Sequence, residues 1–294
     1  MKYTITSEFA GKTIKDFLKG EGVSANLLKK LKKIENGILV NSHHQNVTYH
    51  LQENDILELN AQDCEGDVNE YLEPVDLPIE IIYEDENITV VNKPSNMPTH
   101  QSLNNHGNTL ANALMFRYRG KPYVFRASNR LDKDTSGVVI TANNQYYASL
   151  ISRKIQKGEV VKEYIAVVNG KVEGHGIIDA PIDRIEQSII KRIVRDDGER
   201  AVTEYKALLT SDEISVLSVF PRTGRTHQIR VHMEYIGHPI IGDALYFEES
   251  PFIKRQALHC SKMAVDNIGE FCAPLPADMI DLIRRYFKNE EINI

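Results

Sequence analysis

The chain has 294 residues, of which 41% are hydrophobic and 26% are charged, and this composition excludes a fibrous or disordered protein. Its length suggests roughly two domains. The formal net charge of −6 by itself argues against a nucleic-acid partner. No apolar run approaches the roughly 18 residues of a membrane span. The first residues lack the apolar core and cleavage site of a secretory signal, so we expect a cytoplasmic protein.

The negative charge is concentrated in one segment. The net charge is +1 over residues 1–60, −10 over residues 61–92 and +3 over residues 93–294. Residues 61–78 also contain two prolines and a glycine and have no helical period of apolar residues, as expected of a solvated linker. We therefore predict an acidic linker at residues 61–78, between a module at 1–60 and a domain at 79–294. An acidic surface loop within one domain is the alternative.

Residues 1–60 predict a small module of two helices and a short sheet. Ile14, Phe17 and Leu18 share one helical face, and Ser24 is a suitable N-cap for a second helix that ends near Gly37. The second helix directs four lysines outward, namely Lys29, Lys30, Lys32 and Lys33. Two β-type runs follow, "GILVN" and "DILELN". A basic helix suits RNA binding, although lysine-rich helix faces are also common on solvated surfaces.

The remainder of the chain predicts an α+β domain with a large, mainly antiparallel sheet. A hairpin is expected with its turn at residues 84–87. Further strands are expected at "SGVVITA", "VVKEYIAVVN", "AVTEYKALLT" and "EISVLSVFP". Helices are expected at "TLANALMFRYRG" and "ADMIDLIRRYFK", and they interrupt the strands without regular βαβ alternation.

Several chemistries have no support in the sequence. The three cysteines are an odd number without CxxC spacing, so neither a disulfide framework nor a zinc site is expected. Phosphate-binding, dinucleotide-binding, hydrolase and metalloprotease motifs are absent from the sequence. The histidines of "HHQNVTYH" fit an exposed loop better than a metal site. We therefore expect no metal and no cofactor.

Two stretches are dense in polar residues. The first, "NRLDKDTSG" at residues 129–137, carries aspartates that an ordinary turn would explain, because Asp and Ser side chains bond their own backbone and Gly allows positive φ. The second, "PRTGRTHQIRVHMEYIG" at residues 221–237, predicts a strand end, a turn and a helix. Thr226 is the expected N-cap of that helix, and Gly237 follows its C-terminus.

Arg230 on this helix has two possible partners. It could pair with Glu234 one turn further on, which would contribute only about 0.3 to 0.5 kcal/mol, or it could face a carboxylate elsewhere in the fold. Arg222 and Arg225 precede the helix, and in either case they would create a positive site suited to phosphate.

Together the two stretches resemble the RluA-type family of RNA pseudouridine synthases. The family signature is approximately H-R-L-D-x-x-T-S-G, and residues 129–137 match it except that Asn129 replaces the histidine. Its later signature, approximately T-G-R-T-H-Q-I-R-V-H followed by G-H-P-I-x-G-D, is matched by residues 223–232 and 237–243. "VNKPSNMPTH", "KEYIAVVNG" and "LHCSKMAV" also match in order. The N-terminal unit looks like an S4-type RNA-binding module, a RluD-like arrangement.

The resemblance implies isomerisation of uridine to pseudouridine in RNA, without a cofactor. It implies that Asp132 is the catalytic carboxylate, that Arg230 pairs with it and that Tyr164 stacks on the uracil and helps to remove a proton. Substrate contacts are expected from Arg130, beside the catalytic aspartate, and from Arg222, Arg225, His227 and Ile229.

The expected substrate is structured RNA, with large-subunit ribosomal RNA as the first choice and transfer RNA as the second, and the expected state is a monomer. A non-catalytic RNA-binding or ribosome-assembly factor with the same fold is one alternative. A hydrolase that uses Asp132 together with Asp134 is another.

Overall fold

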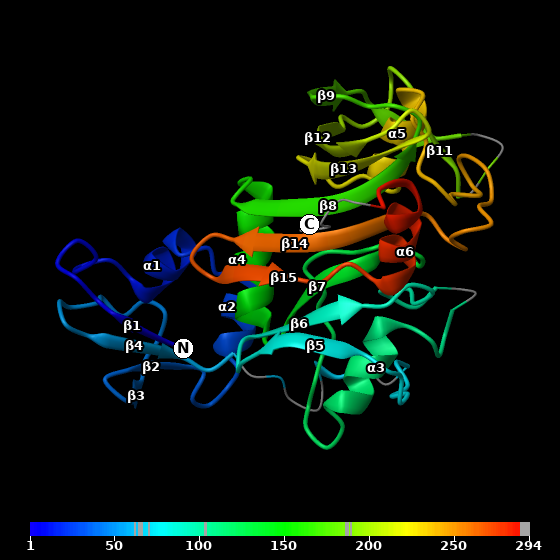
Figure 1. Ribbon diagram of the computed structural model, residues 1–294. Coiled ribbons are helices and arrows are strands. Elements are labelled where there is room, and N and C mark those ends of the chain that lie inside the picture. Colours follow the sequence, from blue (N-terminus) through cyan, green and yellow to red (C-terminus); the bar gives the residue numbers. More distant parts are fainter. Residues whose placement is uncertain are drawn as a thin grey trace.

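The computed structural model describes residues 1–288 apart from residues 62, 64–66, 70, 103, 104, 186, 187 and 189. The described part of the chain has three β-sheets, of four, two and nine strands, and the two larger ones organise the fold. Figure 1 shows the four-stranded sheet and its helices as a lobe of their own, at one side of the large sheet. We call residues 1–61 the N-terminal lobe.

The N-terminal lobe has the expected two helices and an antiparallel sheet in the order β1-β4-β2-β3. Thr13 and Ser24 cap the two helices, since their hydroxyl oxygens accept from the backbone N–H groups of Asp16 and Leu27. The apolar faces of the helices form a core of their own under the sheet. The elements are β1 (Lys2–Thr4), α1 (Ile14–Gly20), α2 (Ala25–Leu31), β2 (Ile38–Val40), β3 (His43–His44) and β4 (Ile56–Leu59).

Two details of this lobe differ from the sequence prediction. Helix α2 ends at Leu31 instead of continuing to Gly37, because the chain folds back on the helix end. A Cβ at Gly37 would lie 2.1 Å from the Leu31 carbonyl oxygen, so only glycine allows this approach. Strands β1 and β3 were not anticipated, and the exposed His43 and His44 form β3.

The large sheet is mainly antiparallel, as predicted. Its order is β5-β6-β7-β14-β8-β13-β12-β9, and β15 pairs with β14. The pairing of β7 with β14 is parallel, and the other pairs are antiparallel. The strands are β5 (Glu80–Glu84), β6 (Ile88–Lys93), β7 (Ser136–Ala142), β8 (Val160–Asn169), β9 (His175–Asp179), β12 (Val202–Thr210), β13 (Ile214–Pro221), β14 (Leu258–Val265) and β15 (Gly269–Cys272).

Burial explains which strands are central. All seven residues of β7 are buried, as expected of a strand covered on both faces. Four helices and a hairpin of β10 (Ile182–Arg184) and β11 (Arg192–Val194) accompany the sheet. The helices are α3 (Leu110–Arg117), α4 (Gln145–Gln156), α5 (Gln228–Tyr235) and α6 (Ala277–Tyr286). None of the described helices is both long and apolar enough to cross a membrane.

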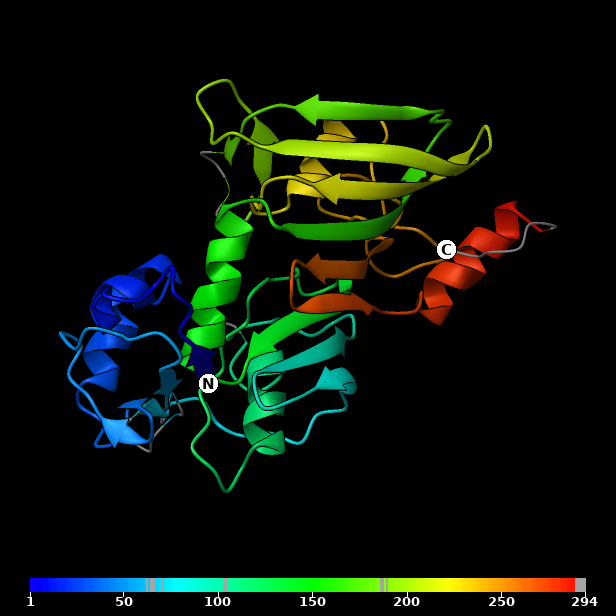
Figure 2. The same ribbon diagram turned by 90° about the vertical axis from the view of Figure 1, so that its left-hand side faces the viewer.

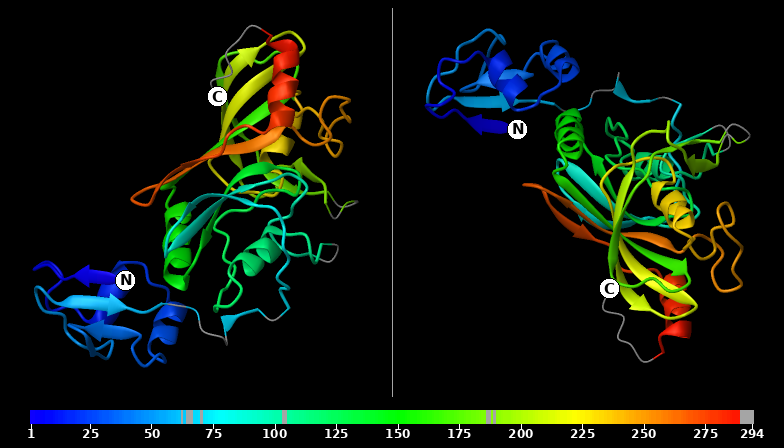
Figure 3. Two further views of the ribbon diagram at one scale, coloured as in Figure 1. Left: turned by 60° about the horizontal axis from the view of Figure 1, so that its bottom comes forward. Right: turned by 90° about the horizontal axis from the view of Figure 1, so that it is seen from above.

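Helix α4, which the sequence did not reveal, joins the two lobes. In the view from above in Figure 3, α4 lies between the N-terminal lobe and the large sheet, and Figure 2 shows the same contact from the side. Tyr146 of α4 is part of the N-terminal core, and its hydroxyl accepts from that of Tyr3 at 2.6 Å. Arg153 donates to the Gly20 carbonyl oxygen at 3.1 Å.

The acidic segment is not simply solvated at Asp63. The Asp63 side chain is 2% exposed and lies 2.6 Å from Arg126 of the large domain and 3.8 Å from Lys30 of α2. A solvated carboxylate would not be so enclosed, so the prediction of a solvated linker is wrong at this residue. Cys64 and several neighbours lie outside the described residues, and the division at residues 60 and 78 stays a prediction.

Candidate active site

Side-chain hydrogen bonds hold the first residues of the loop that carries Asp132. Asn129, the residue that departs from the family pattern, donates from Nδ2 to the Val138 carbonyl oxygen at 3.0 Å and accepts at Oδ1 from the Ile140 N–H at 3.0 Å. The Thr99 hydroxyl accepts from the Leu131 N–H and donates to the Leu131 carbonyl oxygen. Asn129 therefore has a structural explanation, because an amide both donates and accepts.

Two buried cations fix the middle of the loop. The ammonium of Lys93 donates to the carbonyl oxygens of Pro94, Met97 and Lys133 at 2.7 to 3.1 Å. Burial lowers the pKa of Lys93 to about 7, while three carbonyl acceptors require the three donors of the charged form. Arg255 donates to the Asp134 carbonyl oxygen at 3.1 Å. Asp134 thus serves the loop through its backbone, as an ordinary turn residue.

The turn at residues 135–137 is bonded to β14 and to the residues just before it. Gln256 donates to the Thr135 hydroxyl at 3.2 Å, and Ser136 lies 2.9 Å from Nδ1 of His259. Gly137 has a φ of +114°, and a Cβ there would lie 2.1 Å from the Cys260 carbonyl oxygen. Glycine is thus needed for both the conformation and the close approach to β14. The anchors hold Asp132 in one place.

Helix α5 supplies the arginine that faces Asp132. Its N-cap is His227, in the left-handed conformation at a φ of 57°, without a side-chain cap hydrogen bond. The prediction that Thr226 caps the helix is therefore wrong. Gln228 instead orders the preceding turn, because its side-chain oxygen Oε1 accepts from the Thr223 hydroxyl and the Arg225 N–H. Gly237 follows the helix with a φ of 81°, as predicted.

Arg230 contacts two carboxylates outside its own helix. Its Nη1 donates to Oδ2 of Asp132 at 3.0 Å, while Nε and Nη2 donate to both oxygens of Asp243 at 2.7 Å. The alternative pairing with Glu234 is wrong, since that side chain is exposed and the guanidinium points elsewhere. Asp243 was missed as a site residue, although it ends the second family signature. A buried arginine with one predicted carboxylate partner could have prompted the search for a second.

These contacts set the electrostatics of the site. Although burial opposes it, the hydrogen bonds and charge of Asp243, and then of Asp132, raise the pKa of Arg230. Burial lowers the pKa of His227 more than the neighbouring Asp132 raises it. The imidazole Nδ1 lies 2.9 Å from the Tyr246 hydroxyl, and Nε2 lies 3.8 Å from Asp132. Arg230 is therefore the permanent cation beside Asp132.

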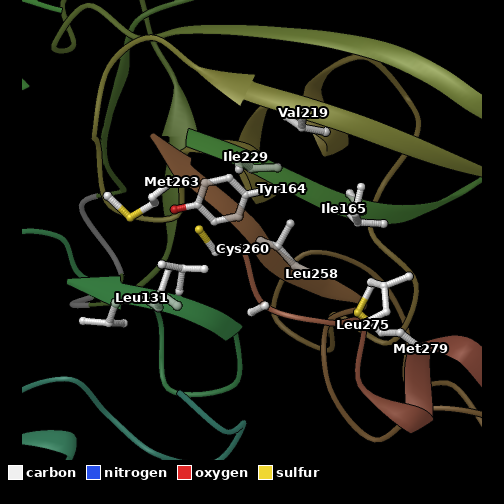
Figure 4. Packing of buried hydrophobic residues seen from close by; sticks show 14 of the residues in the cluster. Leu131, Tyr164, Ile165, Val219, Ile229, Leu258, Cys260, Met263, Leu275 and Met279 are labelled. Carbon is white, nitrogen blue, oxygen red and sulfur yellow. The ribbon is translucent and has the colours of Figure 1, made fainter. Parts of the chain in front are cut away.

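Tyr164 lies on β8, with its ring in the apolar part of the same region. Figure 4 shows it among Ile229, Leu258 and Cys260. Burial raises the pKa of Tyr164 well above its usual value, and Cys260 and Asp132 raise it further. The side chain therefore keeps its proton at neutral pH.

A cavity of about 740 Å³ opens in front of these groups. Asp132, Tyr164 and Arg230 all line it, and such a volume is typical of small-molecule sites. Of the described residues that line it, Asp132 is the one acid, whereas five are Lys or Arg, namely Arg130, Lys133, Lys162, Arg225 and Arg230. The cavity is thus positive in a chain whose formal net charge is −6.

The predicted substrate-binding residues are only partly assembled around this cavity. Arg130, Arg225, His227 and Ile229 line it with the three predicted catalytic residues. Arg222 is not among the lining residues, and its guanidinium forms a bidentate pair with Glu204. Arg225 pairs with Glu199 at 2.8 Å. These two arginines therefore do not form one phosphate site.

The predicted RNA-binding lysines lie in the N-terminal lobe, Lys29 and Lys30 on α2 and Lys32 and Lys33 directly after its end. Lys29, Lys32 and Lys33 are exposed. Lys30 differs, because its ammonium lies 2.5 Å from Asp67 and 3.8 Å from Asp63. The expectation that all four lysines point outward is therefore wrong for Lys30.

Comparisons with known proteins agree on one family. Residues 87–235 match the RNA pseudouridylate synthase family. An uncharacterized RNA pseudouridine synthase of Bacillus subtilis, YjbO, is 36% identical over 281 residues, which cover 92% of this chain and 98% of that protein. Ribosomal large subunit pseudouridine synthase D of Vibrio cholerae is 36% identical and covers 75% of each chain. Human RNA pseudouridylate synthase domain containing 1 superimposes with a TM-score of 0.56 at 26% identity, over 72% of this chain and 96% of that one.

Proposed function

Since this chain belongs to the RluA-type family of RNA pseudouridine synthases, a family of isomerases that act on RNA, we propose that it converts specific uridines of large-subunit ribosomal RNA to pseudouridine. We assign the chemistry to Asp132, in the cavity in front of β7 and α5. The relatives named as synthases of the ribosomal large subunit support this choice of RNA.

The observation that carries the assignment is the chain of charges Asp132, Arg230 and Asp243. A carboxylate inside a water-poor cavity must stay ionised to act on a sugar carbon, and an adjacent cation favours that form. Arg230 supplies the cation at 3.0 Å, and Asp243 holds the guanidinium from the other side at 2.7 Å. Asp132 retains a 28% exposed side chain, so it remains accessible to a ligand from the cavity.

In the proposed reaction the target uridine first leaves its stack, since a stacked base cannot reach the cavity. Such flipping costs a few kcal/mol. The bond between N1 of uracil and C1′ of the ribose then breaks, the base turns, and C5 forms a bond with C1′. N1 gains a proton and C5 loses one, so the product is an isomer of the substrate. Asp132 acts either by attacking the sugar or by stabilising a glycal-type intermediate.

Tyr164 and Ile229 form the apolar part of the proposed base site. A tyrosine whose pKa is raised by burial offers its ring face and its O–H to uracil, but little phenolate at neutral pH. We therefore assign Tyr164 to stacking on the base. Arg130 is exposed at the cavity rim beside Asp132, where it can enter the space left by the flipped base or contact a neighbouring phosphate.

Tritium release tests the assignment of Asp132. Formation of a C–C bond at C5 releases tritium from RNA labelled with [5-³H]uridine. We expect Asp132→Asn to lower this release by roughly 10³-fold or more, the scale of losing an essential catalytic group. Asp134→Asn is the matched control, because Asp134 contributes its backbone carbonyl to the loop. Equal release from the wild type and Asp132→Asn would remove Asp132 from the mechanism.

The RNA class is tested by mapping pseudouridines in cells with and without this gene. We expect the missing positions to lie in large-subunit ribosomal RNA. Missing positions in transfer RNA alone would overturn that part of the proposal and leave the assignment of Asp132 intact.

A further inference from the structure

Lys162 is a cation of the cavity that the proposed chemistry leaves without a task. It lies on β8 two residues before Tyr164, so both side chains project from the same face of the sheet. Both residues line the cavity. Ile155 of α4, Pro221 and Leu258 are among the apolar residues of the same lining.

Arg230, the buried cation of the cavity, is already neutralised, whereas the half-buried Lys162 is not. Arg230 pairs with Asp132 and Asp243. The single acid of the described lining, Asp132, is thus occupied, and within the described part of the chain Lys162 forms neither a salt bridge nor a side-chain hydrogen bond. Burial lowers the pKa of Lys162, and the neighbouring titratable group is the thiol of Cys260.

An ammonium in such a position costs stability unless an anion joins it. The apolar neighbours would pack equally well against a Met or Leu side chain, so packing gives no reason for a lysine here. The missing anion must therefore come from a ligand that enters the cavity. RNA carries one negative charge per nucleotide on its backbone, whereas uracil is neutral before its bond to the sugar breaks.

We propose that Lys162 is a substrate-binding residue that holds a backbone phosphate of the strand carrying the flipped uridine. This inference rests on the proposed function, because it takes RNA as the occupant of the cavity. A volume of about 740 Å³ leaves room beside the base for a neighbouring sugar and phosphate. The compact ammonium of lysine suits phosphate as a point charge. The lysine thereby holds the RNA strand in the cavity while Asp132 acts on the sugar of the flipped uridine.

Steady-state kinetics with Lys162→Met test the proposal. The substrate is [5-³H]uridine-labelled RNA from cells that lack this protein, and the readouts are KM, kcat and their dependence on salt. Loss of one charge-assisted contact should raise KM by about tenfold and change kcat by less than about threefold. The slope of log(kcat/KM) against log[salt] should become shallower by about 1. Lys162→Arg should restore most of the affinity.

A matched control and a stability readout separate binding from structure. Lys171→Met removes the same charge beyond the far end of β8, where Lys171 is 51% exposed and pairs with Glu173, and it should leave KM and the salt slope unchanged. The melting temperature of Lys162→Met should equal or exceed that of the wild type, since a half-buried charge without a partner has been removed.

Three outcomes would overturn the proposal. The first is that KM and the salt slope of Lys162→Met match those of Lys171→Met. The second is a fall in kcat at constant KM that Lys162→Arg does not rescue, which would make the lysine a proton acceptor. The third is a lower melting temperature with unchanged kinetics, which would make it structural. All three are measured with an active wild type, whereas equal activity of the wild type and Asp132→Asn would instead contradict the proposed function.

Discussion

Asp243 determines where the guanidinium of Arg230 lies. Its side chain is 1% exposed and receives two of the arginine's hydrogen bonds, whereas the 28% exposed Asp132 receives one. Removing one partner of a buried ion pair leaves an unmatched charge, which costs about 3 to 5 kcal/mol. A partly exposed pair contributes about 1 kcal/mol or less. The two aspartates should therefore respond differently to the same substitution.

We predict that Asp243→Asn lowers the free energy of unfolding by about 3 kcal/mol, and that Asp132→Asn changes it by about 1 kcal/mol or less. Urea unfolding of the two variants measures the difference. Both variants should lose activity, Asp243→Asn because Arg230 is no longer held in place. A larger loss of stability in Asp132→Asn would show that Asp132, and not Asp243, is the structural partner.

The sequence identified Asp132 and Arg230 but not the third member of the group. Asp243 lies 13 residues after Arg230, beyond the end of α5, and no helical or strand period relates the two positions. The contact exists because the segment after α5 turns back at Gly242, whose φ is 76°. The family resemblance implied the pairing of Asp132 with Arg230, whereas the contact of Arg230 with Asp243 depends on tertiary structure.

At the scale of the elements, β14 supports the loop that carries Asp132. His259 of β14 is fully buried between the loop and β15. Its Nε2 lies 3.2 Å from the Ala273 carbonyl oxygen, which can only accept, so Nε2 carries the proton and Nδ1 accepts from the Ser136 hydroxyl at 2.9 Å. Burial favours this neutral form of the imidazole over the charged one.

The neutral His259 makes stability depend on pH. Burial lowers the pKa of His259 from 6.5 to about 4, so the unfolded chain takes up the proton first as the pH falls. The contribution of the neutral His259 to the free energy of unfolding is present above pH 6.5. It is lost between pH 6.5 and about 4, at up to about 1.4 kcal/mol per pH unit. We predict that His259→Gln, in urea unfolding from pH 7 to 4.5, loses about 2 kcal/mol less than the wild type. Parallel pH profiles for both proteins would contradict this role.

Strand and helix positions were predicted correctly where the apolar pattern of the segment itself determines them. They were missed where pairing with a distant segment determines them. The alternating or apolar runs of β7, β8, β12 and β13 were recognised. The place of β14 between β7 and β8 was not predictable, because it depends on pairing between segments about 100 residues apart. The cap of α5 was misassigned for a related reason. Thr226 has the composition of a cap, but Gln228 orders the turn instead.

Across the whole molecule, Asp63 connects the N-terminal lobe to the part of the chain that holds the large sheet. Arg126 donates from two nitrogens to the two oxygens of Asp63 at 2.6 and 2.8 Å, and Lys30 approaches from α2. On the other side of the lobe, a Cβ at Gly22 would lie 2.1 Å from the guanidinium of Arg153. Contacts at both places attach the N-terminal lobe to the rest of the described chain.

We predict that Asp63→Asn loosens this attachment without unfolding the large sheet. Loss of the charge-assisted bonds should lower the free energy of opening of α1 and α2 by about 1 to 3 kcal/mol, measured by hydrogen exchange. Exchange in β7 should not change. Asp197→Asn is the control, because Asp197 pairs with Arg195 at the surface and is 71% exposed. Unchanged exchange in both helices would show that α4 alone holds the lobe.

The sequence predicted two lobes of different character but not their attachment. The cluster of acids at residues 61–92 predicted a solvated linker, because charge density alone does not reveal that one carboxylate of the group is enclosed by two cations from different lobes. Lys30 was counted with the outward lysines for the same reason. Both errors concern contacts between segments more than 30 residues apart.

The anchoring of the loop that carries Asp132 limits how its sequence can change over evolution. Nine consecutive letters identify the family, yet the position of the carboxylate depends on side chains scattered from Lys93 to His259. If these nine residues were grafted onto another protein, the anchoring side chains would be absent and the aspartate would not be held in one position. Residues 129–137 are thus only the contiguous part of the set of residues that positions the carboxylate. Evolution must therefore preserve the distant anchoring residues as strictly as residues 129–137.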